Sequence, residues 1–256
     1  MRKILIKILL IISCGLAFVG NAQELRIRQV HCKLSPEVLH NIQNALSFQV
    51  DFFATVFKER AIHSFSARIF GTEKEYLRYA RDSAKFNPVR INAIAFYDND
   101  LKEMILHKEI NELSKTFSHE LTHALLHYYC KDAESWFHEG LAEFFEDIVF
   151  LDSTYYFDFS IHKKINDTRE YLKEGYSIES VIDSRNFYDD SSNKNYTLAW
   201  AIFYYLYNAN NTLQKDLIKE ACNLNKESID RIYPGGMDLL KIDLRAFYLN
   251  DLSNLK

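Results

Sequence analysis

The pentapeptide at residues 119–123, which reads HELTH, is the feature that most constrains this chain. Residues four apart on an α-helix lie on the same face, so the imidazoles of His119 and His123 can reach a single metal ion. Two neutral imidazole nitrogens suit Zn²⁺, which catalytic sites hold with three protein ligands and one open position. The carboxylate of Glu120 stands beside the first ligand, where it can take a proton from a water molecule that the ion activates. The pentapeptide therefore predicts a helix that carries part of a zinc site.

A third ligand is expected from residues 136–143, WFHEGLAE, which follow the pentapeptide after a short polar turn. That turn is long enough to reverse the chain into an antiparallel helix, on which Glu139 and Glu143 lie four apart on one face. Glu139 completes a His₂Glu site for one Zn²⁺ ion in this interpretation. Glu143 then faces the back of a ligand histidine and accepts its non-ligating N–H. Gly140, which has no side chain, is expected to let the two helices approach closely.

These two segments, HELTHALL and WFHEGLAEFFE, resemble the gluzincin zinc metallopeptidases of the MA clan. The second segment is similar to the W-x-x-E-G-x-A run of the M1 aminopeptidases and of smaller bacterial peptidases in that clan. Fifteen residues separate His123 from Glu139, a shorter gap than in the M1 enzymes, which favours the smaller relatives. The resemblance implies an α+β, helix-rich, zincin-like domain with a small N-terminal mixed sheet. It also implies these roles: zinc ligands at His119, His123 and Glu139, the general base at Glu120, and a supporting carboxylate at Glu143.

A β-hairpin is expected just before the metal helix, from residues 91–97 and 102–107 joined by Asp98-Asn99-Asp100. In gluzincins, the sheet edge at this point binds the extended substrate backbone by strand addition. The M1 aminopeptidases carry a G-x-M-E-N motif there, which recognises a free amino terminus, and residues 86–107 contain no such motif. The resemblance thus implies a peptide or protein substrate, whereas the missing motif counts against exopeptidase cleavage.

Tyr196 is the expected oxyanion donor. In the related peptidases, a tyrosine on a helix downstream of the third ligand donates its hydroxyl to the tetrahedral oxyanion. Tyr196 follows the polar stretch 184–195 and opens an apolar helical segment, and its Y-x-x-A-W setting resembles that position. A role in the hydrophobic core is the alternative, since the chain contains 16 tyrosines.

The first 22 residues predict a secretory signal sequence, which is not part of the fold. They combine a positive start, an apolar run at residues 8–19 and a small-residue cleavage site at residues 20–22. Residues 11–14, IISC, resemble a bacterial lipoprotein box, so a lipid anchor on Cys14 is the alternative to a periplasmic or secreted protein. Residues 23–256 are expected to form a single domain, and no second apolar run is long enough to span a bilayer.

The charge of the chain after removal of the signal sequence bears on its partners. Removal of the signal sequence takes three positive charges from 31 Lys+Arg against 35 Asp+Glu, which leaves a formal charge of −7. That balance argues against nucleic acid or an anionic membrane as a partner.

Cys32, Cys130 and Cys222 allow one disulfide with a thiol left over, or none. The pairing, the oligomeric state and the cleavage specificity are open at this point.

Helix start signals predict the elements around the metal helix. Ser35-Pro36-Glu37 combines a capping hydroxyl, a first-turn proline and an acid at the positive helix end, and predicts a helix to about Lys58. Thr72 with Glu75 forms a capping box for a helix to about Arg81. Further elements are expected as strands at residues 25–33 and 66–70, and as helices at residues 166–173, 177–183, 196–207 and 213–224.

The sequence therefore indicates two possible functions. The first is an exported zinc-dependent peptidase that uses a metal-activated water and a glutamate base. The alternative is a catalytically inactive, zinc-containing binding or cell-envelope protein on a peptidase fold. Structural zinc sites are closed by four protein ligands and are rich in cysteine, whereas three ligands are visible here, which favours the enzyme.

Overall fold

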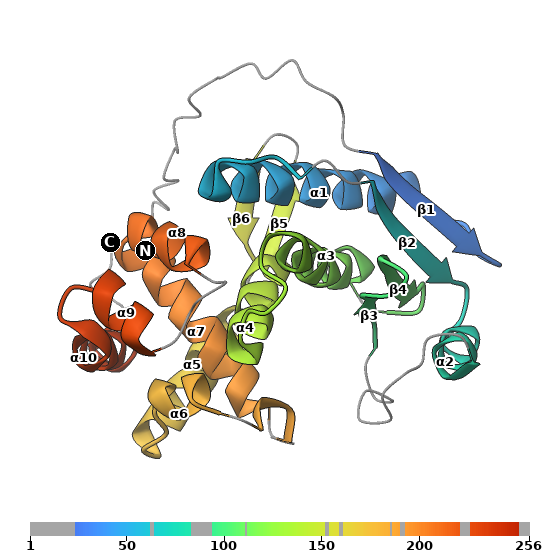
Figure 1. The fold of residues 1–256 in the computed structure, drawn as a ribbon. Coiled ribbons are helices and arrows are strands. Elements are labelled where there is room, and N and C mark those ends of the chain that lie inside the picture. The colour runs from blue at the N-terminus through green and yellow to red at the C-terminus, as the bar shows by residue number, and fades with distance from the viewer. Residues whose placement is uncertain are drawn as a thin grey trace, which may run out of the picture.

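The computed structural model describes residues 24–61, 64–82, 94–110, 112–151, 154–158, 161–184, 186–189, 193–220 and 226–250. The predicted signal sequence, with Cys14, lies outside these residues, as does Cys222. The described chain is α+β, as the sequence predicts, with a small mixed sheet near its start and helices through most of the remainder (Figure 1).

The strands are β1 (Leu25–Val30), β2 (Phe65–Phe70), β3 (Phe96–Asp98), β4 (Glu103–His107), β5 (Ile148–Leu151) and β6 (Thr154–Phe157). The helices are α1 (Pro36–Phe57), α2 (Glu73–Asp82), α3 (Leu113–Tyr129), α4 (Ser135–Glu146), α5 (Ile161–Lys173), α6 (Ile178–Ile182), α7 (Lys194–Ala209), α8 (Asn211–Lys219), α9 (Lys226–Ile232) and α10 (Gly236–Leu249). A 3₁₀ turn, Phe187–Asp189, precedes α7.

The four-stranded sheet has the order β1-β2-β4-β3, in which β3 is antiparallel to β4 and the other pairs are parallel. Successive side chains of a strand point to opposite faces. Ile69 and Leu106 accordingly join the main core with α1 and α3, whereas Phe70 and Ile105 pack with Tyr76 of α2. The predicted hairpin is present as β3 and β4, while residues 91–93 of its first strand lie outside the described residues. Among the described strands, β3 is therefore an edge next to α3.

The predicted capping signals form where the sequence places them. The Ser35 hydroxyl accepts a hydrogen bond from the Val38 backbone N–H at 3.3 Å, and α1 ends at Phe57. The Thr72 hydroxyl accepts one from the Glu75 N–H at 3.3 Å and begins α2. Local sequence thus sets the start of both helices that cover the sheet.

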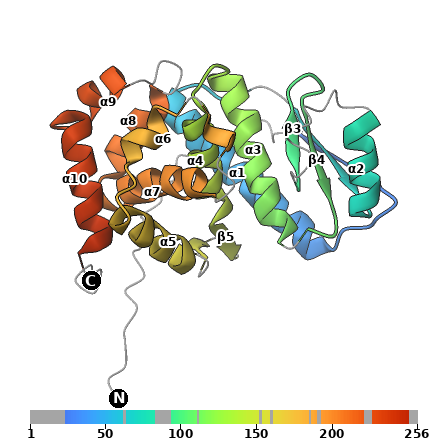
Figure 2. The ribbon, with the colours of Figure 1, turned by 90° about the horizontal axis from the view of Figure 1, so that it is seen from below.

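Helices α3 and α4 lie at the centre of the molecule. Figure 2 shows them between the sheet with α2 on one side and the helices α5 to α10 on the other. The faces of α3 and α4 that meet their neighbours are almost wholly buried, and their apolar side chains belong to one core. None of the described helices is both long and apolar enough to cross a bilayer.

Gly140 allows α7 to pack closely against α4, a contact that the sequence did not predict. A Cβ atom at Gly140 would lie 2.7 Å from the carbonyl oxygen of Ala199 and 2.9 Å from its Cβ, both in α7. Glu139 points toward α3, and the next residue of a helix lies about 100° further round the axis, toward a different neighbour. The glycine expected to bring α3 and α4 together therefore makes its closest approach to α7 instead.

The structure describes two of the three cysteines that follow the predicted signal sequence, Cys130 and Cys32. Cys130 follows α3, is 2% exposed and is disulfide-bonded. Cys32 is a free thiol that donates a hydrogen bond to the Ile69 carbonyl oxygen at 3.3 Å. Of the two described cysteines, one is therefore in a disulfide and the other is a free thiol.

Candidate metal centre

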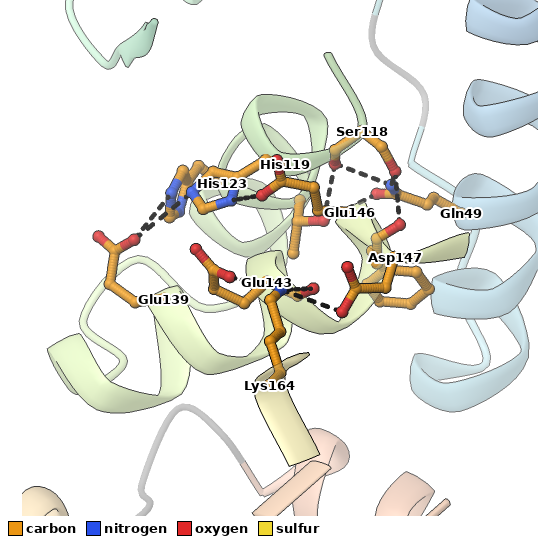
Figure 3. A network of polar contacts seen from close by, with 11 residues as sticks. Gln49, Ser118, His119, His123, Glu139, Glu143, Glu146, Asp147 and Lys164 are labelled. Atoms are coloured by element: carbon orange, nitrogen blue, oxygen red, sulfur yellow. Dashed lines mark hydrogen bonds and ion pairs between the residues drawn. The ribbon is translucent and has the colours of Figure 1, made fainter. Parts of the chain in front are cut away.

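His119, His123 and Glu139 converge on one point between α3 and α4. Oε2 of Glu139 lies 3.5 Å from Nε2 of His119 and 3.6 Å from Nε2 of His123 (Figure 3). Zinc binds nitrogen and oxygen at about 2.0–2.1 Å, so two ligands of a tetrahedral ion lie about 3.4 Å apart. The observed separations match that value. The structure therefore brings the three predicted ligands together at the spacing that one zinc ion requires.

The electrostatics of the three groups favour a cation between them. Burial alone lowers the pKa of His119, but its hydrogen bonds to Glu139 and Glu146 raise that pKa well above the usual value. Burial raises the pKa of Glu139, but the two histidines hold it well below the usual value. The carboxylate thus stays ionised in a buried position, where positive charge must compensate it. The two imidazoles or a bound cation can supply that charge.

Glu146 contacts the imidazole of His119 on the side that faces away from Glu139. Its Oε2 lies 3.1 Å from Nδ1 of His119, the ring nitrogen that faces away from Glu139. The sequence assigned this contact to Glu143, which instead pairs with the Lys164 ammonium at 2.7 Å. Because α3 and α4 run in opposite directions, the histidine nearer the start of α3 meets the carboxylate nearer the end of α4. Glu143 remains close, since ligand atoms of His119, Glu143 and Glu146 lie within 4.8 Å of one another.

Glu120 lies beside the ligands with one oxygen unengaged. Its side chain is 5% exposed, and its Oε2 atom has no hydrogen-bond partner among the described residues. Burial raises the pKa of this carboxyl group above its usual value. Most buried polar atoms in proteins are hydrogen-bonded, so an unpartnered carboxylate oxygen beside a candidate metal site marks a position where a ligand or water can bind.

A cavity of about 1010 Å³ opens onto these residues. Its walls come from the chain before and within β3, from α3 and α4, and from α5 and α7. Tyr196 lines it from the first turn of α7, as its predicted role requires. His127 and His138 line it as well, but neither belongs to a group of potential metal ligands among the described residues. The cavity thus connects the ligands, Glu120 and Tyr196 in one cleft.

Tyr188 is a site residue that the sequence did not reveal. It lies in the 3₁₀ turn Phe187–Asp189 and lines the same cavity, and its hydroxyl donates a hydrogen bond to Oε1 of Glu139 at 3.1 Å. The turn lies within the polar stretch 184–195, and no residue spacing links that stretch to α4. Only the tertiary fold brings the tyrosine to the ligand.

Residues 114–225 match the family described as "Protein of unknown function (DUF1570)". The matched segment begins in α3, continues beyond α8 and contains every residue proposed above for the site, although it covers less than half of the chain. No curated protein matches the chain.

A buried polar network fixes α3 from the side opposite the ligands. The Gln49 amide of α1 donates hydrogen bonds to the Ser118 carbonyl oxygen at 2.9 Å and to its hydroxyl at 2.7 Å. The Thr122 hydroxyl donates to the Gln49 side-chain oxygen at 3.1 Å. The Ser118 hydroxyl donates in turn to the carbonyl oxygen of Phe145, the residue before Glu146, at 3.0 Å. These contacts link α1, α3 and the end of α4, and Figure 3 shows Gln49 beside Ser118 next to the two histidines.

Proposed function

We propose that the protein is an exported zinc-dependent peptidase of the gluzincin type, which hydrolyses bonds within a peptide or protein substrate. The observation that carries the proposal is the convergence of His119, His123 and Glu139 at zinc spacing, with the unengaged carboxylate oxygen of Glu120 beside them on a cleft. A structural zinc site is closed by protein ligands, and its role requires neither a buried base nor a cleft of this size.

The donor set suits zinc. Two imidazoles and one carboxylate are a known ligand set of catalytic zinc, with a fourth position left to water or substrate. The histidine Nδ1–Glu146 contact is the kind of outer hydrogen bond that fixes a ligand ring and raises its basicity. When bound, a zinc ion supplies a Lewis acid that lowers the pKa of a water molecule and polarises a carbonyl group.

The residues of the chain supply the remaining steps. Glu120 takes the proton of the attacking water and then delivers it to the leaving amine. Tyr196, which lines the cleft, donates its hydroxyl to the oxyanion. The strand β3 lies at one end of the described sheet order, which is the position at which an extended substrate adds to a sheet in strand addition. This arrangement supports a zincin-like fold and internal rather than terminal cleavage.

Export accords with the disulfide at Cys130. Disulfides persist in oxidising compartments and are rare in the cytosol. Together with the predicted signal sequence at residues 1–22, this supports a periplasmic or secreted protein, with a lipid anchor on Cys14 as the alternative.

Metal analysis tests the proposal. Elemental analysis by mass spectrometry is expected to find one zinc per chain in the purified protein, and less than one tenth of that in His123→Ala. A peptide library analysed by mass spectrometry is expected to show internal cleavage that a chelator stops and added zinc restores. Zinc without cleavage would support the inactive binding protein, and protein that neither contains nor takes up zinc would contradict both functions.

Tyr196→Phe is expected to lower kcat by about 100-fold or more, since the loss of one oxyanion donor has effects of that order. The zinc content is expected to stay unchanged, because the hydroxyl acts on the substrate. Tyr171→Phe is the matched control, since that tyrosine lines the same cavity from α5. Equal turnover of Tyr196→Phe and the parent protein would assign Tyr196 to the core.

A further inference from the structure

The two oxygens of Glu139 have different surroundings. Oε2 lies 3.5 Å and 3.6 Å from the Nε2 atoms of the two histidines, whereas Oε1 accepts the hydrogen bond of the Tyr188 hydroxyl at 3.1 Å. A carboxylate ligand can bind a metal through one oxygen or through both. A donor on Oε1 competes with the metal for that oxygen's lone pairs. The tyrosine therefore bears directly on the way in which Glu139 binds a metal.

We propose that Tyr188 is a positioning residue that keeps Glu139 a one-oxygen ligand, and so keeps the fourth coordination position free for water. The inference rests on the proposed zinc centre. With the Tyr188 hydroxyl present, Oε1 is engaged and Oε2 alone faces the metal. Without it, the carboxylate can turn and bring both oxygens onto the ion, in the position that the attacking water needs.

The turn that carries Tyr188 is well anchored. The neighbouring Phe187 is 2% exposed, and its ring centroid lies 5.1 Å from that of Tyr196 in α7. The Asn195 side-chain amide of α7 donates a hydrogen bond to the Phe187 carbonyl oxygen at 2.8 Å. The backbone of the turn is thus tied to α7, which itself packs closely on α4 at Gly140. This chain of contacts fixes the distance between the Tyr188 backbone and Glu139.

The Tyr188 ring itself is 43% exposed and lines the cleft. Its hydroxyl therefore reaches the ligand from the side on which a substrate binds. A residue that only filled the core would be buried on all sides, whereas the hydroxyl of this one donates a directed hydrogen bond to a buried carboxylate. Its removal is expected to change the metal site and leave the packing of the protein largely intact.

Cobalt(II) is the probe that tests the proposal, because the intensity of its visible absorption falls as the coordination number rises above four. Metal-free parent protein and Tyr188→Phe are each titrated with Co²⁺ alone. The parent is expected to give the strong bands of a four-coordinate ion. Tyr188→Phe is expected to give clearly weaker bands, and a Kd for Co²⁺ about 10-fold higher, as loss of an outer hydrogen bond typically produces.

Tyr171→Phe is the matched control, since that tyrosine lines the same cavity from α5 and has no place in the proposed metal centre. It is expected to keep the parent's cobalt spectrum and Kd. A Tyr188→Phe spectrum identical to that of the parent overturns the inference, whatever its Kd. If the parent protein itself fails to bind Co²⁺ or zinc, the proposed metal centre fails, so the two failures are distinguishable.

Discussion

Glu120→Gln is expected to reduce peptide hydrolysis to the background level while one zinc ion remains bound per chain. The amide keeps the shape of the carboxylate but cannot accept the proton of the attacking water, and general-base catalysis typically contributes about 10²–10⁴-fold. The side chain is buried beside His119 without being one of the three converging ligands, so the metal site is expected to survive. Cleavage of a peptide library and elemental analysis on the same preparation measure both quantities.

Glu134→Gln is a suitable control for this variant. Glu134 precedes α4, is exposed, and forms no side-chain hydrogen bond at the helix start. It carries the same charge change near the same helices and is expected to retain parent turnover. An active Glu120→Gln protein would refute the base role. A metal-free Glu120→Gln protein would show that Glu120 instead supports the ligands.

The convergence of His119, His123 and Glu139 was predictable because it depends mainly on helical geometry. The i, i+4 spacing of His119 and His123 sets their common face before any tertiary contact forms. Glu139 requires only that the second helix turn back on the first, which the short polar turn dictates. The capping residues Ser35 and Thr72 are local for the same reason, and both mark helix starts in the structure.

The supporting contacts were not predictable, because they depend on how helices cross. Glu143 and Glu146 lie within one turn of α4, and a small rotation of that helix decides which of them reaches His119. Gln49 meets Ser118 across 69 residues of sequence, and Tyr188 meets Glu139 across 49. No periodicity in the sequence marks such pairs. Gly140 shows the same limit, since the sequence identifies a close approach but not the helix that makes it.

Lys164→Met is expected to lower the free energy of unfolding by about 3–5 kcal/mol, the cost of leaving a buried charge without its partner. The Lys164 ammonium lies 2.7 Å from Glu143 and 3.0 Å from Asp147, and its side chain is 22% exposed. Burial by itself lowers the pKa of Lys164, but the two carboxylates raise it, so the lysine is charged in the folded protein. Urea denaturation followed by circular dichroism measures the loss.

The neighbouring Lys163 separates the ion pair from a general effect of charge. Its side chain is 85% exposed and lies 3.4 Å from Asp167, so Lys163→Met is expected to change the free energy of unfolding by no more than about 0.5 kcal/mol. Adding Glu143→Gln to Lys164→Met removes the unpaired carboxylate and is expected to recover part of the loss. Asp147 limits that recovery, although burial raises its pKa and eases its protonation. If the double variant is less stable than Lys164→Met alone, Glu143 stabilises the fold through contacts other than this ion pair.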